Sequence, residues 1–176
     1  HAFNDTVERI AGKAQLQVSS GDAGFAEEVL ERVQSLREVR AAAPVIETEA
    51  DTGFPGQGKL LILAVDMTGD RSLRDYDFDN AEENVIEDPL IFLAQPDSLI
   101  LTREFAARNH IAVGSKIAFD TMEGRRQFTV RGILKAGGMA QAFGGNLGIM
   151  DLYAAQSLFG RGRHFDRIDI ALQEGV

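Results

Sequence analysis

Apolar and polar residues follow regular patterns along the first third of the chain, and each pattern predicts one element. Apolar and polar positions alternate over residues 12–20, which predicts a strand with one solvent-facing side. Over residues 25–36 the apolar positions recur at helical spacing with charged positions between them, which predicts an amphipathic helix. Residues 39–49 predict a second strand, in which Pro44 marks an edge or a bulge because proline cannot donate to the ladder. The continuous apolar run of residues 60–65 predicts a buried strand.

The last third of the chain repeats this order of elements. Residues 147–150 and 167–172 predict strands, and residues 152–159 predict a helix with Asp151 as its N-cap. Two strand-helix-strand units can share one sheet with both helices on the same face, because each helix must bury its apolar side. The pattern therefore predicts an α+β fold in which an α/β lobe carries both units.

The middle of the chain is more polar, and its predicted elements are shorter. Residues 71–88 are acidic with scattered aromatic residues, which indicates a long surface loop. Residues 90–92 and 99–101 predict short strands. The helix after them is predicted to have Thr102 as its N-cap and Asn109 as its left-handed stop. We therefore expect short elements joined by a long loop.

A predicted hairpin completes this middle segment. Residues 116–121 and 126–135 have the composition of strands and are separated by a short turn. The change in character predicts that residues 67–136 form a small β-rich lobe inserted into the α/β lobe. The α/β lobe then comprises residues 1–66 and 137–176, and a glycine-rich stretch after residue 136 forms the return path.

Composition and charge narrow the class of protein. The 176 residues are 44% hydrophobic, which is enough for a buried core, and no cysteine is present to form a disulfide or a thiolate metal site. With 27 acidic against 18 basic residues, the net charge of −9 repels phosphate backbones, so we expect no nucleic-acid partner. No apolar run approaches the roughly 18 residues of a membrane-spanning helix. We expect the chain, which begins abruptly at His1 and stops at Val176, to be a soluble piece of a longer protein.

Two patterns resemble ligand-binding loops, and each lacks residues that the chemistry needs. The acidic run that begins at Asp75 resembles the first half of a calcium loop. Such a loop has glycine and a bidentate glutamate where this chain has Asn80 and Ile86. The paired glycines within residues 137–145 lack the Gly-Lys-Ser/Thr ending of a phosphate-binding loop. We therefore interpret both segments as surface loops.

The two internal histidines, His110 and His164, are far apart in the sequence. Nucleophilic catalysis needs a serine or cysteine held by a base, and no nucleophile-elbow motif occurs in this sequence. A metal centre needs histidines and carboxylates at short spacing, which the sequence also lacks. We predict no catalytic residue, no metal ligand and no cofactor, and we do not expect an enzyme.

Two apolar segments in turns are the candidate contact residues. Phe54 and Pro55 stand in a turn, and Met139 and Phe143 stand in the glycine-rich stretch. Large apolar side chains on loops are costly unless they are buried or used for contact. They either fold back onto the interface between the lobes or contact a substrate, a second copy of the domain or a partner protein.

The second half of the chain carries an order of motifs that resembles one family. The strand of residues 98–102 and a short helix lead to a Val-Gly-Ser-Lys turn at residues 113–116. A strand pair follows, then a Met-Asp-Leu strand end at residues 150–152 and an Ala-Gln-x-Leu-Phe-Gly helix at residues 155–160. This order resembles the extracytoplasmic core domain of MacB-like and FtsX-like permeases of ABC transporters. The resemblance covers nearly the whole chain and is weaker before residue 98.

The resemblance implies a fold, a location and partners. The α/β lobe of this family is similar to the porter subdomains of multidrug efflux pumps, and its inserted lobe is β-rich. The domain would lie on the extracytoplasmic, or periplasmic, side of the bacterial inner membrane, attached by flanking helices absent from this chain. Its partners would be a cytoplasmic ABC ATPase, reached through the full-length permease, and a second permease copy. A periplasmic adaptor or a lipoprotein could join them.

The function implied by the resemblance is mechanical. The domain would transmit an ATP-driven conformational change to a periplasmic substrate or partner in export, efflux or lipoprotein release. ATP hydrolysis would take place in a separate cytoplasmic subunit or domain. A free-standing or membrane-anchored extracytoplasmic binding module of similar fold, without ATPase coupling, is the alternative.

Overall fold

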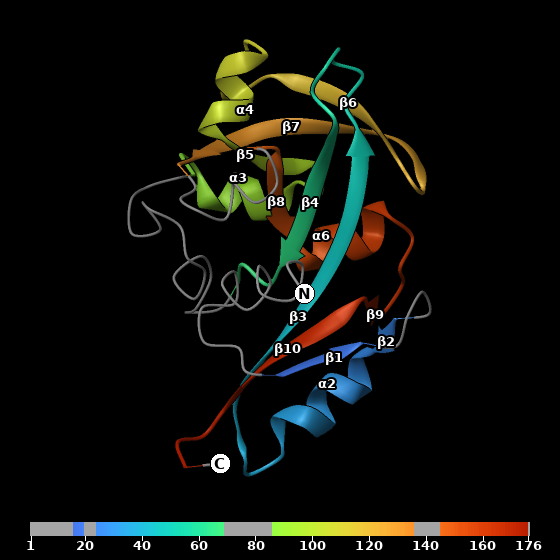
Figure 1. The fold of residues 1–176 in the computed structure, drawn as a ribbon, viewed down its shortest axis with the longest axis vertical. Helices are drawn as coiled ribbons and strands as arrows, with labels where there is room; N and C mark the ends of the chain where they lie inside the picture. Colours follow the sequence, from blue (N-terminus) through green and yellow to red (C-terminus); the bar gives the residue numbers. More distant parts are fainter. Residues whose placement is uncertain (1–15, 20–23, 69–85, 136–144, 176) are drawn as a thin grey trace.

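The structure, a computed structural model, describes residues 16–19, 24–68, 86–135 and 145–175 (Figure 1). The described helices are α2 (Glu27–Gln34), α3 (Pro89–Ala94), α4 (Arg103–Arg108) and α6 (Leu152–Leu158). The described strands are β1 (Leu16–Ser19), β2 (Phe25–Ala26), β3 (Val39–Asp51), β4 (Lys59–Val65), β5 (Ser98–Thr102), β6 (Lys116–Thr121), β7 (Gly124–Leu134), β8 (Leu147–Asp151), β9 (His164–Phe165) and β10 (Arg167–Leu172).

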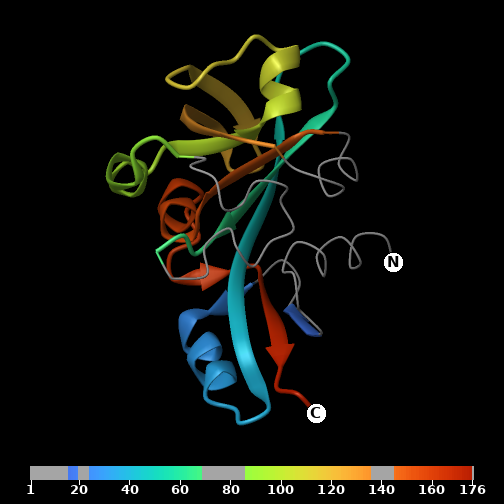
Figure 2. The same ribbon diagram turned by 90° about the vertical axis from the view of Figure 1, so that its left-hand side faces the viewer.

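The sheet is organised around β3, which is 13 residues long. Eight described strands follow the order β1-β10-β3-β4-β8-β5-β7-β6, and β2 and β9 form a separate pair. β10 pairs with β3 as far as Val45, and β4 pairs with it from Val45 to Asp51. The last residues of β3 also pair with β6, so that the six strands from β3 to β6 close into a ring. Figures 1 and 2 show β3 as the long cyan strand that runs from α2 to the β6–β7 hairpin.

Alternation along β4 divides the core between the two faces of the sheet. Leu60, Ile62 and Ala64 belong to one buried cluster, to which α2, α4 and α6 contribute side chains. The residues that alternate with them belong to a second cluster, which contains Phe92 of α3. α2 and α6 therefore pack against the same cluster, as the sequence pattern predicts.

The periodic segments formed the predicted elements. The apolar run became β4, the hairpin became β6 and β7, and the last unit became β8, α6 and β10. Asp151 is the N-cap of α6, because its carboxylate accepts hydrogen bonds from the N–H groups of Tyr153 (3.2 Å) and Ala154 (3.4 Å). Of the strand predicted over residues 12–20, the structure describes Leu16–Ser19 as β1.

Pro44 lies at an edge position within β3 and not at a bulge. It stands opposite Ile168 of β10, and the pairing with β4 begins only at the next residue, Val45. The register irregularity between β3 and β10 lies instead between Ala171 and Leu172. Proline thus occupies the point at which β3 gains its second neighbour, where a missing N–H is tolerated.

The strand predicted over residues 90–92 is wrong, because these residues form part of α3. The carboxylate of Asp88 accepts a hydrogen bond from the N–H of Ile91 at 3.1 Å, and Pro89 opens the helix. An aspartate N-cap followed by proline favours a helix start, since proline lacks the N–H that a first turn leaves unpaired.

The ends of α4 also differ from the prediction. Thr102 stands at the N-cap, but its hydroxyl donates to the carbonyl of Gly145 at 2.6 Å and makes no capping bond. Asn109 is not the left-handed stop; its φ is −109°, and its side chain donates to the carbonyl of Phe105 at 2.9 Å. The left-handed residue is the next one, His110, with φ of 55°.

Strands from the predicted insertion join the same sheet as the rest of the chain. β5 pairs with β8, and β6 pairs with β3. The division into lobes of residues 1–66 with 137–176, and of residues 67–136, stays a prediction. The acidic run from Asp75 to Asn80 and most of the glycine-rich stretch lie outside the described residues.

Candidate functional site

The chain enters and leaves the sheet at neighbouring positions. Leu16, the first residue of β1, stands opposite Ile170 near the end of β10, and Ser19 stands opposite Arg167. Figure 1 shows β1 and β10 side by side next to α2. The two strands are therefore joined along the whole length of β1.

β3 connects this entry point with the rest of the molecule. Val45 stands opposite Arg167 of β10 on one side and opposite Val65 of β4 on the other. The hydrogen-bonded ladder therefore passes from β1 through β10 and β3 to the ring without interruption. We call the region around Val45 the junction.

Two carboxylates and one arginine bridge the junction from outside the sheet. Arg161, between α6 and β9, forms an ion pair with Glu123 in the turn of the β6–β7 hairpin. Its Nε also lies 3.2 Å from Oδ1 of Asp166, which stands between β9 and β10. The other oxygen of Asp166 accepts a hydrogen bond from the backbone N–H of Glu47 in β3 at 2.8 Å. We call Glu47, Glu123, Arg161 and Asp166 the junction cluster.

The charges of Arg161 and Asp166 shift each other's pKa. Burial alone would lower the pKa of Arg161, but the negative charges of Asp166 and Glu123 outweigh it and raise that pKa. Burial raises the pKa of Asp166 even though Arg161 counteracts it. The arginine thus stays charged, and it holds two carboxylates that belong to different elements.

A second, fully buried ion pair lies in β10 beside the cluster. Nε of Arg167 lies 3.0 Å from Oδ1 of Asp169, and the guanidinium also pairs with Glu47. Arg167 is 3% exposed and Asp169 is 2% exposed. Burial lowers the pKa of the arginine and raises the pKa of the aspartate, since each partner compensates the lost hydration only in part. In the described part of the chain, Nη2 of Arg167 and Oδ2 of Asp169 lack a hydrogen-bond partner.

α3 presents apolar side chains to solvent. Leu90 is 82% exposed, and Ile91 and Leu93 are also exposed, whereas Phe92 is buried beneath them. Figure 2 shows α3 (green) at the periphery of the molecule. Sequence reasoning missed this surface because it assigned the segment to a strand; the Asp-Pro start was the signal that could have found it.

The predicted contact residues are placed in different surroundings. Phe54 is half-buried and packs against the first core cluster, with its ring 6.1 Å from that of Phe105. Pro55 beside it is exposed. Met139 and Phe143 lie outside the described residues. A contact role for these residues stays a prediction.

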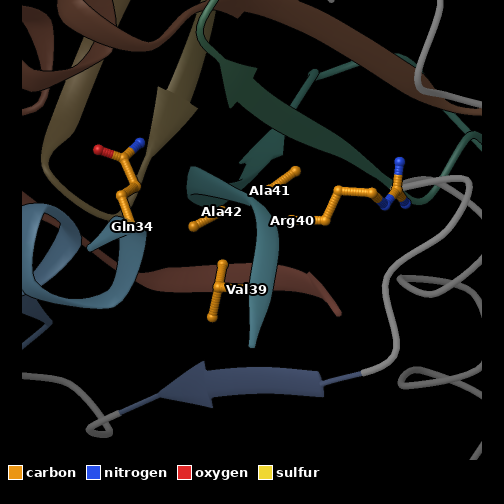
Figure 3. A pocket seen from close by; sticks show the side chains of 5 residues that line it. All are labelled: Gln34, Val39, Arg40, Ala41 and Ala42. Carbon is orange, nitrogen blue, oxygen red and sulfur yellow. The ribbon is translucent and has the colours of Figure 1, made fainter. Parts of the chain in front are cut away.

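The described residues hold a shallow hollow but no cluster of metal-ligating groups. Among them, no group of three or more histidine, cysteine, aspartate or glutamate side chains could hold a metal ion. The hollow lies where α2 meets β3, and in Figure 3 the side chain of Arg40 extends away from that of Gln34. Polar groups on these two side chains therefore do not converge on a common ligand. The hollow is lined by Gln34, Val39, Arg40, Ala41 and Ala42.

The two internal histidines are both exposed and belong to different parts of the fold. His110 follows α4, and His164 lies in β9.

No helix of the described residues is long and apolar enough to cross a membrane.

Comparison with known proteins identifies the class of domain that carries this arrangement. Residues 1–176 match the model of the MacB-like periplasmic core domain, so the chain belongs to this family. No curated protein matches the chain at a significant level.

Two solved structures share the fold. One is the extracellular domain of the noncanonic ABC-type transporter YknZ from Gram-positive bacteria, with a TM-score of 0.60 and 12% identity over 88% of this chain and 76% of that one. Another is the periplasmic region of MacB from Actinobacillus actinomycetemcomitans, with a TM-score of 0.55 and 9% identity over 97% of this chain and 79% of that one. The chain is therefore a MacB-like periplasmic domain of an ABC transporter permease, with a mixed α+β fold.

Proposed function

We propose that this domain transmits an ATP-driven conformational change from the membrane part of its permease to a substrate or partner outside the cytoplasmic membrane. The observation that carries the proposal is the pairing of β1 with β10, in which Leu16 stands opposite Ile170. Because β1 and β10 are paired in this way, movement of the segment that enters the sheet and of the segment that leaves it reaches the sheet at the same place. The uninterrupted ladder through β3 supports delivery of that movement to the ring of strands.

The proposed partners follow from the family. A cytoplasmic ATPase binds and hydrolyses ATP, and this domain carries no catalytic role of its own. A second permease copy stands beside the first, and a periplasmic adaptor or a lipoprotein contacts the outer surface. Attachment to the bacterial inner membrane is through helices of the full-length permease. Export, efflux and lipoprotein release all use such a transmission, and the transported substrate is left open.

Movement of the domain during the ATPase cycle tests the proposal. Lys116 is exposed at the start of β6, and the domain contains no cysteine of its own. A spin label at Lys116→Cys in a full-length permease, otherwise free of cysteine and dimeric with its ATPase, reports the distance between the two copies of the domain. We expect this distance to change when ATP is bound to a hydrolysis-deficient ATPase.

An unchanged distance in both nucleotide states would overturn the coupled mechanism. It would favour the alternative, an extracytoplasmic binding module of the same fold that works without ATPase coupling. A permease monomer that never pairs would contradict the predicted second copy independently of the coupling.

A further inference from the structure

The ring of strands closes through a very short backbone contact. β6 pairs with β7 over six residue pairs but with β3 over only two, Ala50 with Thr121 and Asp51 with Asp120. A two-pair ladder gives the backbone at this edge of the hairpin little resistance to opening, although Phe119 and Phe128 anchor the hairpin in the core. Side chains must therefore contribute to holding the hairpin against the rest of the molecule.

Arg161 makes that connection at the hairpin turn. Its guanidinium binds Glu123, the last residue before β7, and at the same time Asp166, the last residue before β10. The exposed fractions of the three side chains are 26% for Arg161, 17% for Glu123 and 29% for Asp166, so water screens the pairs only in part. The arginine thus connects the β6–β7 hairpin of the ring with the start of β10.

Neighbouring contacts give the bridge a fixed geometry. Nε of Arg126 in β7 donates to the carbonyl of Leu158 at the end of α6 at 2.8 Å. Asp166 is held in turn by the Glu47 N–H, and its own N–H donates to the carbonyl of Val45 at 3.0 Å. Glu47 and Val45 lie at the point of β3 where β10 pairing gives way to β4 pairing.

We infer that Arg161 is a positioning residue that makes β10 and the β6–β7 hairpin move as one body. The inference rests on the proposed function for its purpose. A domain that transmits movement needs β1 and β10, which would receive the movement, tied to the β6–β7 hairpin. In the absence of the bridge, β3 can bend at the junction and the displacement of β10 is absorbed before it reaches the hairpin.

The distance between the two parts measures this coupling directly. Spin labels at Glu31→Cys in α2 and Lys116→Cys in β6 place one probe on each side of the junction, on exposed positions. We expect one narrow distance distribution in the parent chain and a broadened distribution in Arg161→Gln. Arg161→Lys keeps a positive charge between Glu123 and Asp166, so it should restore part of the narrow distribution.

Arg131→Gln is the matched control. Arg131 pairs with Asp97 at 2.7 Å with exposed fractions of 22% and 33%, similar to those of Arg161 and Glu123. Both partners lie in or beside β5 and β7, so this pair does not span the junction. We expect its loss to lower stability and to leave the distance distribution unchanged.

Hydrogen exchange gives a second readout from the other side of the bridge. In Arg161→Gln we expect the exchange rate of the Glu47 amide to rise on the order of tenfold, the change for a weakened charge-assisted hydrogen bond. Glu123→Gln removes the hairpin partner alone, and combining it with Arg161→Gln should broaden the distribution no further than Arg161→Gln by itself.

An unchanged distance distribution in folded Arg161→Gln would overturn the inference, and so would equal broadening in Arg161→Gln and Arg131→Gln. The distance between positions 31 and 116 lies within one copy of the domain, so the result does not depend on an ATPase. If Arg161→Gln broadens the distribution but the permease shows no nucleotide-dependent movement, the proposed function is contradicted. The inference about Arg161 then still holds.

Discussion

The ring of Phe54 lies 6.1 Å from the ring of Phe105, and the two planes are inclined by 58°. Phe105 is buried in α4 and lies 6.4 Å from Phe119, which lies 5.9 Å from Phe128. Phe54 is therefore the half-buried end of a row of aromatic side chains that runs into the core. Its position in a turn does not make it a free apolar tip.

Phe54→Ala should lower the free energy of unfolding by about 2 kcal/mol, roughly half the loss for a fully buried phenylalanine. The reason is the lost packing against Phe105 and the cluster behind it. Chemical denaturation measures the loss, and Pro55→Ala at the exposed neighbouring position is the control, with little expected change. A Phe54→Ala variant as stable as the parent would show that this side chain serves contact and not packing.

Asp151→Ala should destabilise the protein by about 1–2 kcal/mol, as expected for loss of an N-cap. The carboxylate caps α6 and also accepts a hydrogen bond from the N–H of Met67 at 3.2 Å, so alanine leaves three donors without this acceptor. Asp151→Asn keeps an acceptor, and because burial raises the pKa of Asp151 a neutral side chain is well tolerated there. Thermal unfolding of the two variants should rank asparagine above alanine; the reverse order would contradict the cap.

Asp97 should make stability depend on acid pH in a defined direction. Burial alone would raise the pKa of Asp97, but hydrogen bonds from Thr129 (2.6 Å) and Arg131 (2.7 Å), with the charge of Arg131, lower it below its ordinary value of 3.8. A lowered pKa in the folded state gives stability that is present above the unfolded value and is lost as the pH falls through the folded value.

Asp97→Asn should therefore cost about 1 kcal/mol at neutral pH, and this difference should disappear as the pH falls below the folded pKa of Asp97. Urea denaturation of both proteins over a pH series measures the difference. The carboxylates whose pKa values are raised are present in both proteins, so their contribution to the pH dependence cancels in the difference. A gap that persists unchanged at the lowest pH would show that the ionised carboxylate is not the source of the stability.

Gly24→Ala should be more damaging than Gly56→Ala, although both glycines have left-handed backbones with φ of 66° and 72°. A Cβ at Gly24 would strike the backbone carbonyl oxygen of Phe165, whereas a Cβ at Gly56 would meet open space. We expect about 1 kcal/mol of backbone strain at Gly56 and a larger loss at Gly24, where the β2–β9 pair must also shift. Equal losses in thermal unfolding would contradict the close approach.

The sequence predicts those parts of the fold in which one residue and its near neighbours decide the outcome. The apolar run of β4, the β6–β7 hairpin and the Asp151 cap are of this kind. The apolar residues from Leu90 to Phe92 show no decisive period, and the preceding Asp-Pro pair made them helical. Asn109 capped α4 with its side chain and left the positive φ to His110.

The junction cluster could not be predicted from the sequence. Glu123 and Arg161 are 38 positions apart, and Glu47 and Asp166 are 119 positions apart, with no motif that connects them. Single charged residues of this kind are ordinarily solvated, and only the pairing of β10 with β3 and the closure of β6 onto β3 bring them together. Family resemblance identifies the fold and gives no information on such side-chain pairs.

The position of the last strands in the sheet sets the order in which this domain can fold. β8 lies between β4 and β5, and β10 lies between β1 and β3, so the C-terminal segment supplies two interior strands. Before these residues are available, β1 has no partner in the described sheet order, and β4 and β5 present open edges. Long-range pairings such as Leu16 with Ile170 form slowly, because the loop between them must close first. Folding of the sheet is therefore complete only after the strands of residues 147–172 have been synthesised, and a chain interrupted before residue 147 exposes edges that favour aggregation.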